Sequence, residues 1–306
     1  MAVTLLIATF VIFGSLFLAP GNPITFLTQG RTASPEVIAQ LEAQYHLNEP
    51  FLVQYGKWLL GVLQGDLGRS ILLNQEITGI LGPLAINTLF LVGYAAVLIV
   101  VIGMVVGVFA GLKPGWVDGV LMTAATVMMS VPAFVAAVVL ILVFSVQLGW
   151  FPVFGAGEGF LDRLHHTTLP AISLAMMSIA FMARLTRVSV RQELNSEHFQ
   201  TGISRGLPYG LVVRRHVLRN AAVPVLTTAG VAVATLIAIT TVVEQIFQLN
   251  GLGSYLLSAV QRQDFPVVQA ICLIYVAVFI VFNTLIDLSY SLLDPRIPLG
   301  STEAAK

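Results

Sequence analysis

Long apolar runs alternate with short polar segments along the chain, and six of the runs are long enough to cross a bilayer. A transmembrane helix needs about 20 apolar residues. Trimming each run at its Gly, Pro and polar flanks gives expected spans near 2–19, 84–112, 118–147, 169–187, 221–246 and 268–290. The runs do not alternate apolar with polar residues as barrel strands do. The pattern therefore predicts an all-α, polytopic membrane protein with six transmembrane helices.

Composition and charge add an orientation to this picture. The 306 residues are 57% hydrophobic and 10% charged, against roughly 25% charged residues in soluble domains. Basic residues gather in the polar segment between the fourth and fifth spans, which the positive-inside rule places in the cytoplasm. Six spans then put both termini in the cytoplasm and residues 20–83 outside, in a multi-pass protein of the inner membrane. No Lys or Arg precedes the first run, which favours a span over a signal peptide.

The external segment has helical patterns of its own. Residues 34–47 begin with Ser34 and Pro35, which suit a helix cap and a first helical position. Residues 51–65 mix aromatic and aliphatic side chains with one Lys, as in a helix lying along a membrane interface. The chain is thus expected to be one membrane domain, residues 1–306, with a small external helical cap.

The polar segment at 188–220 has a pattern of its own. "NSEHFQTGISRG" predicts a short helix that starts near Asn195 or Ser196, with Gly206 as its C-terminal cap. The residues from Tyr209 to Pro224 predict a second helical piece that runs into the membrane. Two helices with a glycine turn, projecting from a membrane, suggest a docking element for a cytoplasmic partner.

This segment resembles the EAA loop of binding-protein-dependent ABC importer permeases, in the version of the dipeptide, oligopeptide and nickel permease family. Gly206 matches the glycine of that loop, and "HVLRNAAVP" (216–224) matches the run that follows it. The three positions that name the motif depart from it, because they hold Gln200, Thr201 and Gly202.

The resemblance covers nearly the whole chain. Segments similar to the family's motifs lie at 18–23, 45–70, 130–155, 242–270 and 293–298. It implies the type I permease architecture and a permease subunit that forms half of a translocation pathway for peptides. It also implies as partners a second homologous permease, two cytoplasmic ATPase subunits that hold ATP and Mg²⁺, and an external binding protein.

The same resemblance implies which residues couple to the ATPases. The expected coupling residues are Phe199, Gln200, Thr201, Gly202, Ile203, Arg205, Gly206 and Leu207. Within this set, the four-residue spacing of Phe199, Ile203 and Leu207 predicts an apolar ridge on one helical face.

Catalytic motifs do not shape the interpretation. The sequence has no phosphate-binding loop, no H-E-x-x-H and no C-x-x-C, and its one cysteine is Cys272. We therefore expect a transport protein that has no catalytic residues, holds no cofactor in this chain and binds no nucleic acid. A stand-alone secondary transporter is the less favoured alternative, because it predicts more charge inside the spans and detectable internal repeats.

A metal-importing relative of the same family is a further alternative. His165 and His166 are adjacent, and methionines occur in two neighbouring pairs. Adjacent residues on a helix point about 100° apart, so one ion is poorly chelated by such a pair. No metal ligand is therefore expected in this chain.

Two further groups of residues attract attention. Gly103, Gly107 and Gly111 repeat every four residues, which lets helices approach closely, either within the chain or at a permease interface. Glu244, Gly251 and Gly253 are expected at an outer gate or binding-protein contact. Glu244 either faces the pathway or is an interfacial, water-facing residue.

Overall fold

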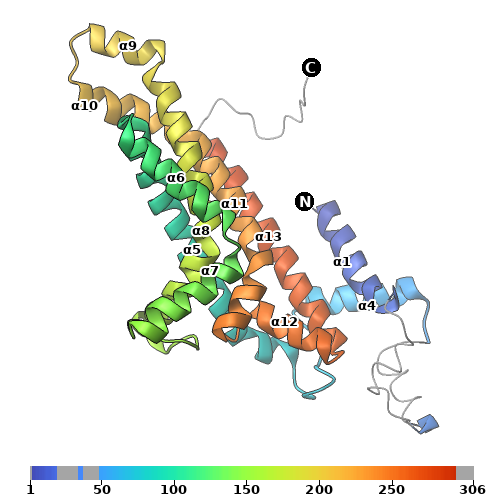
Figure 1. The fold of residues 1–306 in the computed structure, drawn as a ribbon. Helices are drawn as coiled ribbons and strands as arrows, with labels where there is room; N and C mark the ends of the chain where they lie inside the picture. Colours follow the sequence, from blue (N-terminus) through green and yellow to red (C-terminus); the bar gives the residue numbers. More distant parts are fainter. Residues whose placement is uncertain (1, 19–33, 37–47, 294–306) are drawn as a thin grey trace. The chain divides into compact units, whose positions relative to one another are not determined.

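The computed structural model describes residues 2–18, 34–36 and 48–293, and Figure 1 traces their helices. The longer helices are α1 (Ala2–Leu18), α4 (Phe51–Leu63), α5 (Ile77–Leu112), α6 (Trp116–Ser130), α8 (Gly159–Leu194), α11 (Leu218–Phe247), α12 (Leu252–Gln261) and α13 (Phe265–Leu293). The shorter ones are α7 (Ala133–Leu140), α9 (Glu197–Ser204) and α10 (Tyr209–Val212), with π-helical turns η1 (Ile141–Gln147) and η2 (Val213–Val217). The all-α prediction is confirmed.

Membrane-spanning capacity is carried by the longest helices. In the described part of the chain, α5, α8 and residues 265–284 of α13 are each long and apolar enough to cross a bilayer. Two bent helix pairs raise this number to five if each is one span, and α1 is a shorter apolar helix. The chain is thus a polytopic membrane protein, while the count of six spans stays a prediction.

The third predicted span, near 118–147, is not one straight helix. Helix α6 ends at Ser130, and α7 with η1 continues after a bend of 103°. Pro132 explains the break, because a proline has no N–H to donate and forces the preceding residue out of the helical region. Val131 is accordingly extended, with φ −93° and ψ 117°.

The chain forms two compact units. The first combines residues 1–88 with 250–280, and its apolar core joins the start of α5 to α12 and α13. In it, α4 packs Tyr55 and Trp58 against Phe13 of α1 and leaves Leu60 and Leu63 exposed. This division into an aromatic and an aliphatic face fits the interfacial helix predicted at 51–65. Of the helix predicted at 34–47, only 34–36 lie among the described residues.

The second unit combines residues 89–249 with 281–306 and is organised around α8. This helix begins ten residues before the predicted span and extends to Leu194, so the first part of segment 188–220 is a continuation of α8. Helices α6, α7 and α11 pack against α8. At the far end of α8, α9 and α10 form a short projection (Figure 1).

Candidate functional site

The projection begins with a helix whose two ends are set by local hydrogen bonds. The Ser196 side chain caps α9 by accepting a hydrogen bond from the Phe199 N–H at 3.4 Å. At the other end, Gly206 has a φ of +76°, its N–H donates to the Ile203 carbonyl, and the Leu207 N–H donates to the Gly202 carbonyl. This is the Schellman arrangement, which stops the helix and reverses the chain. The predicted start near Ser196 and the predicted glycine cap are both present.

The chain then returns to the membrane domain without a further break. After Pro208, α10 passes through the π-helical turn η2 into α11, as predicted for the second helical piece. Val213 and Val217 of this return pack with Val190 of α8, and Phe199 of α9 packs against them. The projection is therefore a helical hairpin with an apolar base.

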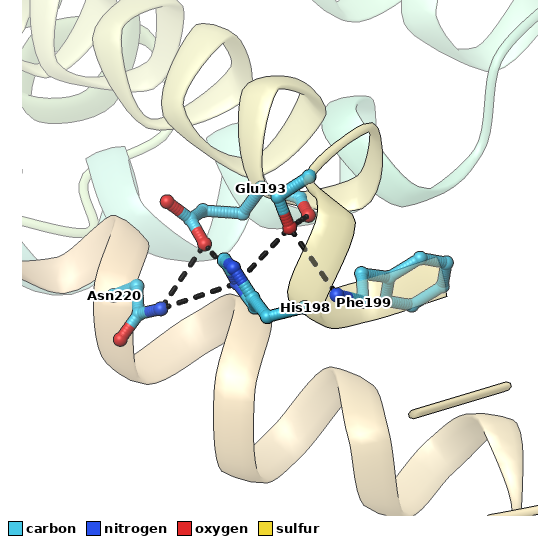
Figure 2. A network of polar contacts seen from close by, with 5 residues as sticks. Glu193, His198, Phe199 and Asn220 are labelled. Carbon is cyan, nitrogen blue, oxygen red and sulfur yellow. Dashed lines mark hydrogen bonds and ion pairs between the residues drawn. The ribbon is translucent and has the colours of Figure 1, made fainter. Parts of the chain in front are cut away.

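A polar network binds the same base together, as Figure 2 shows. The Glu193 carboxylate, in the last turn of α8, lies 2.8 Å from Nε2 of His198 on α9. The same carboxylate oxygen accepts a hydrogen bond from the Asn220 amide on α11 at 3.1 Å. The Ser196 hydroxyl donates to the Glu193 backbone carbonyl at 2.6 Å. Glu193 of α8 thus contacts the turn at Ser196, α9 and α11.

The apolar ridge expected from the four-residue spacing of Phe199, Ile203 and Leu207 is not formed as predicted. Helix α9 ends at Ser204, so Leu207 lies beyond the reversal and cannot share its face. Phe199 is half-buried in the apolar base, and its ring meets Tyr209 edge-on at 5.9 Å. The glycine cap at Gly206 ends the helix, although the four-residue apolar spacing continues to Leu207.

The hairpin instead exposes a mixture of apolar and polar side chains. Apolar side chains are exposed on both arms, namely Ile203, Leu207, Tyr209 and Leu211. Arg205, Arg214 and the predicted coupling residues Gln200 and Thr201 are also exposed. We call the four apolar side chains the hairpin patch.

Gly202 lies on the inner side of α9. It is buried, and a Cβ at this position would stand 3.2 Å from Cγ1 of Val212. The absence of a side chain lets α9 and α10 approach closely, so Gly202 belongs to the inside of the hairpin and not to its surface.

Residues 202–206 also spell G-x-S-x-G, the spacing of the α/β-hydrolase nucleophile elbow. In that motif the serine stands on a sharp turn between a strand and a helix. Ser204 ends a helix, and its hydroxyl donates to the Gln200 carbonyl at 2.9 Å. The letters match the motif while the structural context does not, so Ser204 has no nucleophile geometry.

The glycine repeat of α5 packs within the chain. A Cβ on Gly103 would lie 2.6 Å from the Met182 Cβ, and one on Gly107 would lie 2.4 Å from the Thr186 Cβ. Gly111 meets Val190 in the same way, at 2.8 Å from its Cγ1. The three glycines therefore let α5 lie directly on α8. They are packing positions within the chain.

Glu244 does not face water. Its exposed fraction is 0%, in the last turn of α11, so the water-facing alternative is wrong. The helix ends at Phe247, and the next residue, Gln248, takes the left-handed conformation with φ 50°. The burial of an acidic side chain at a helix end keeps Glu244 among the functional candidates.

Gly251 and Gly253 lie in the other compact unit, at the start of α12, and both are buried. The Leu252 N–H between them donates to the Thr88 hydroxyl of α5 at 2.8 Å. The turn that carries these glycines is therefore held by a buried side chain of α5 and is not a solvated loop.

The sequence did not predict one further cluster of charged residues, between the first turn of α6 and the C-terminal part of α8. The Asp118 carboxylate forms an ion pair with Arg187, and its second oxygen lies 2.6 Å from the Arg191 guanidinium. An acidic residue in the first turn of an otherwise apolar helix was the available signal for a buried partner.

The adjacent histidines point to different neighbours. Nε2 of His165 lies 2.8 Å from the Trp150 carbonyl, and Nδ1 of His166 lies 3.3 Å from the Asp162 carboxylate. Among the described residues, no group of three or more His, Cys, Asp or Glu side chains is placed to hold a metal ion.

Comparison with known proteins identifies the class to which this fold belongs. Residues 103–298 match the family described as the binding-protein-dependent transport system inner membrane component. Residues 1–72 match the N-terminal part of such membrane components. The chain belongs to this family, and it is therefore the permease component of a binding-protein-dependent transport system and a multi-pass inner membrane protein.

Individual relatives cover nearly the full length. A dipeptide transport system permease protein of Alkalihalophilus pseudofirmus is 34% identical, with 94% of each chain covered. A glutathione transport system permease protein of Pectobacterium atrosepticum is 35% identical, with 96% of this chain and 94% of the relative covered.

Solved structures share the fold at lower identity. An amino acid ABC transporter chain matches with a TM-score of 0.55 and 19% identity, over 70% of this chain and 94% of its own. A chain of a methionine ABC transporter in inward-facing conformations matches with a TM-score of 0.54 and 16% identity, over 68% of this chain and 93% of its own.

Proposed function

We propose that this chain is the permease subunit of an ATP-driven peptide importer. It forms half of the translocation pathway, paired with a second homologous permease. Two cytoplasmic ATPase subunits hold the ATP and Mg²⁺, and an external binding protein delivers the substrate. The peptide cargo is supported by relatives named for dipeptide and glutathione transport, both of which are peptide substrates.

The hairpin of α9 and α10 is the ATPase-binding element in this proposal. The observation that carries it is the hairpin patch. Ile203, Leu207, Tyr209 and Leu211 are exposed there, on a hairpin whose helices, α9 and α10, are too short to span a membrane. Apolar and aromatic side chains bordered by arginine are typical of protein interfaces. A partner groove that covers the patch removes this surface from water and gains the free energy of apolar burial.

Orientation follows from the same assignment. An ATPase-binding hairpin lies in the cytoplasm together with both termini, and residues 20–83 lie outside. The basic residues exposed on the hairpin and its return, such as Arg214 and Arg219, support this orientation.

The turn before α12 is proposed as part of the outer gate or of the binding-protein contact. Gly251 and Gly253 are buried there, so Gly253→Val adds a branched side chain at a buried position. We expect this variant to lose uptake and binding-protein-stimulated ATP hydrolysis. Normal values of both would remove the turn from the transport cycle.

The proposal is tested by purifying a tagged chain from its native membrane in mild detergent. We expect a second permease and ATPase subunits to co-elute, and the reconstituted complex to take up labelled dipeptide only with ATP and the binding protein. Uptake by the isolated chain without ATP would establish a secondary transporter instead. Uptake of nickel but not of dipeptide would assign the metal cargo.

A further inference from the structure

The Glu193 carboxylate joins α8 to both α9 and α11 by directed polar contacts, as Figure 2 shows. We propose that Glu193, with His198 and Asn220, is a positioning clamp that makes these three helices move as one body when a partner displaces α9. This inference rests on the proposed ATPase binding, because it says how a displacement of the hairpin reaches the membrane helices.

The chemistry of the contacts suits a clamp. An ionised carboxylate only accepts hydrogen bonds, and one oxygen of Glu193 receives both the His198 ring N–H at 2.8 Å and the Asn220 amide at 3.1 Å. Hydrogen bonds to an ionised group are shorter and stronger than those between neutral groups. Because the two donors come from different helices, loss of this oxygen frees both helices from α8 and leaves only the 3.3 Å contact between the Asn220 amide and Nε2 of His198 in this network.

A second set of contacts fixes the backbone at the same place. The Ser196 hydroxyl donates to the Glu193 carbonyl and accepts from the Phe199 N–H, and it lies 3.0 Å from Nε2 of His198. The turn from α8 to α9 is therefore closed on Glu193 by its main chain and by its side chain. A rotation of α9 about this turn has to break both.

The apolar base alone does not provide this constraint. Val190, Val217 and the half-buried Phe199 hold α9 near α8 and α11, but dispersion and hydrophobic contacts have no preferred direction. Helix α9 has only 8 residues, and it is joined to its neighbours by the short segments 195–196 and 205–208. Without directed bonds, a force on the hairpin patch tilts α9 on these two segments before α11 moves.

Exposure separates a positioning role from a purely structural one. The side chains of Glu193 and His198 are 25% and 45% exposed, and exposed ion pairs contribute little to folding stability. The clamp can therefore be removed without unfolding the protein, and its loss is expected to appear in coupling and not in assembly.

The coupling test uses the complete transporter in proteoliposomes with labelled dipeptide. Glu193→Ala and Asn220→Ala are expected to retain co-purifying ATPases and stimulated ATP hydrolysis, while peptide taken up per ATP falls about tenfold. The loss in the double variant is expected to be clearly smaller than the sum of the two single losses, because Glu193 and Asn220 share one hydrogen bond. Gln192→Ala, an exposed neighbour on α8, is the matched control and keeps the wild-type ratio.

A conservative replacement adds a readout that simple destabilisation does not move. His198→Gln keeps an N–H donor near the Nε2 position and is expected to restore most of the uptake per ATP that His198→Ala loses. Equal ratios for Gln and Ala, additive losses in the double variant, or wild-type ratios in Glu193→Ala would each overturn the clamp. Absence of ATPases from the wild-type preparation would instead overturn the proposed function.

Rigid-body motion is tested directly by distance. Spin labels at Thr201 on α9 and Arg219 on α11, both exposed, are placed in a chain carrying Cys272→Ala. One narrow distance distribution is expected with and without ATP in the wild type, and a broad one in Glu193→Ala. A wild-type distance that changes between the two states would show that α9 and α11 move independently.

Discussion

Gly206→Val tests the turn of the α9–α10 hairpin separately from the side-chain contacts of the hairpin. A Cβ at Gly206 would meet nothing within 4 Å, so a side chain there has room. The cost is in the backbone, because φ is +76° and the left-handed conformation costs an L-residue roughly 1–2 kcal/mol. A β-branched residue at positive φ is a genuine outlier, which places valine at or above the upper end, about 2 kcal/mol.

This magnitude decides what the variant does. A penalty of about 2 kcal/mol is well below the roughly 5–15 kcal/mol that holds a domain folded, so the protein is expected to insert and to be expressed normally. The same penalty shifts a local equilibrium by about 30-fold, since about 1.4 kcal/mol is a factor of ten. Arg205 to Leu207 are then expected to leave the Schellman turn and to redirect the hairpin patch.

The assay is ATP-dependent uptake of labelled dipeptide at matched expression. We expect Gly206→Val to abolish uptake and Gly206→Ala to reduce it. Gly206→Asn is expected to stay close to wild type, because asparagine tolerates the left-handed region. Wild-type uptake by Gly206→Val would refute the reasoning and leave the hairpin as a connector.

Two further predictions concern helix packing and a buried hydrogen bond. Gly107→Ala places a Cβ 2.4 Å from the Thr186 Cβ. We expect it to destabilise the purified complex by about 3 kcal/mol and to lower its thermal midpoint. The control, Gly93→Ala in the same helix, has open space and is expected to leave the thermal midpoint equal or higher. Ser70→Ala removes a hydroxyl that donates to the Asp264 carboxylate at 2.5 Å, and Asp264 is only 2% exposed. We expect a loss of stability of about 1–3 kcal/mol, measured as faster limited proteolysis of residues 64–76. Unchanged digestion would show that this hydrogen bond does not hold the segment.

The parts of the hairpin that sequence predicts are those with local causes. The Ser196 cap acts on a residue three positions away, and the Gly206 cap depends on one residue's freedom to adopt positive φ. Both signals are readable in one short window. The bend before α7 had an equally local signal in Pro132, but the apolar run across it concealed the break.

The parts that sequence did not predict depend on residues distant along the chain. Glu193 and Asn220 are 27 positions apart and meet only because α8 and α11 pack together. Asp118 meets Arg187 across 69 positions for the same reason, through α6 and α8. Helical periodicity gives the face of each helix but not the facing residue on another, so these contacts required the structure.

Proximity of the hairpin patch to the ATPase tests the central claim most directly. A single cysteine is placed at Ile203 in the complete transporter with Cys272→Ala, and a short bifunctional thiol and amine reagent is added to permeabilised cells. The account predicts a cross-linked product of permease and ATPase subunit with Ile203→Cys, and none with Trp150→Cys, an exposed residue on the loop between η1 and α8. Equal cross-linking from both positions, or an Ile203→Cys product without ATPase, would contradict it.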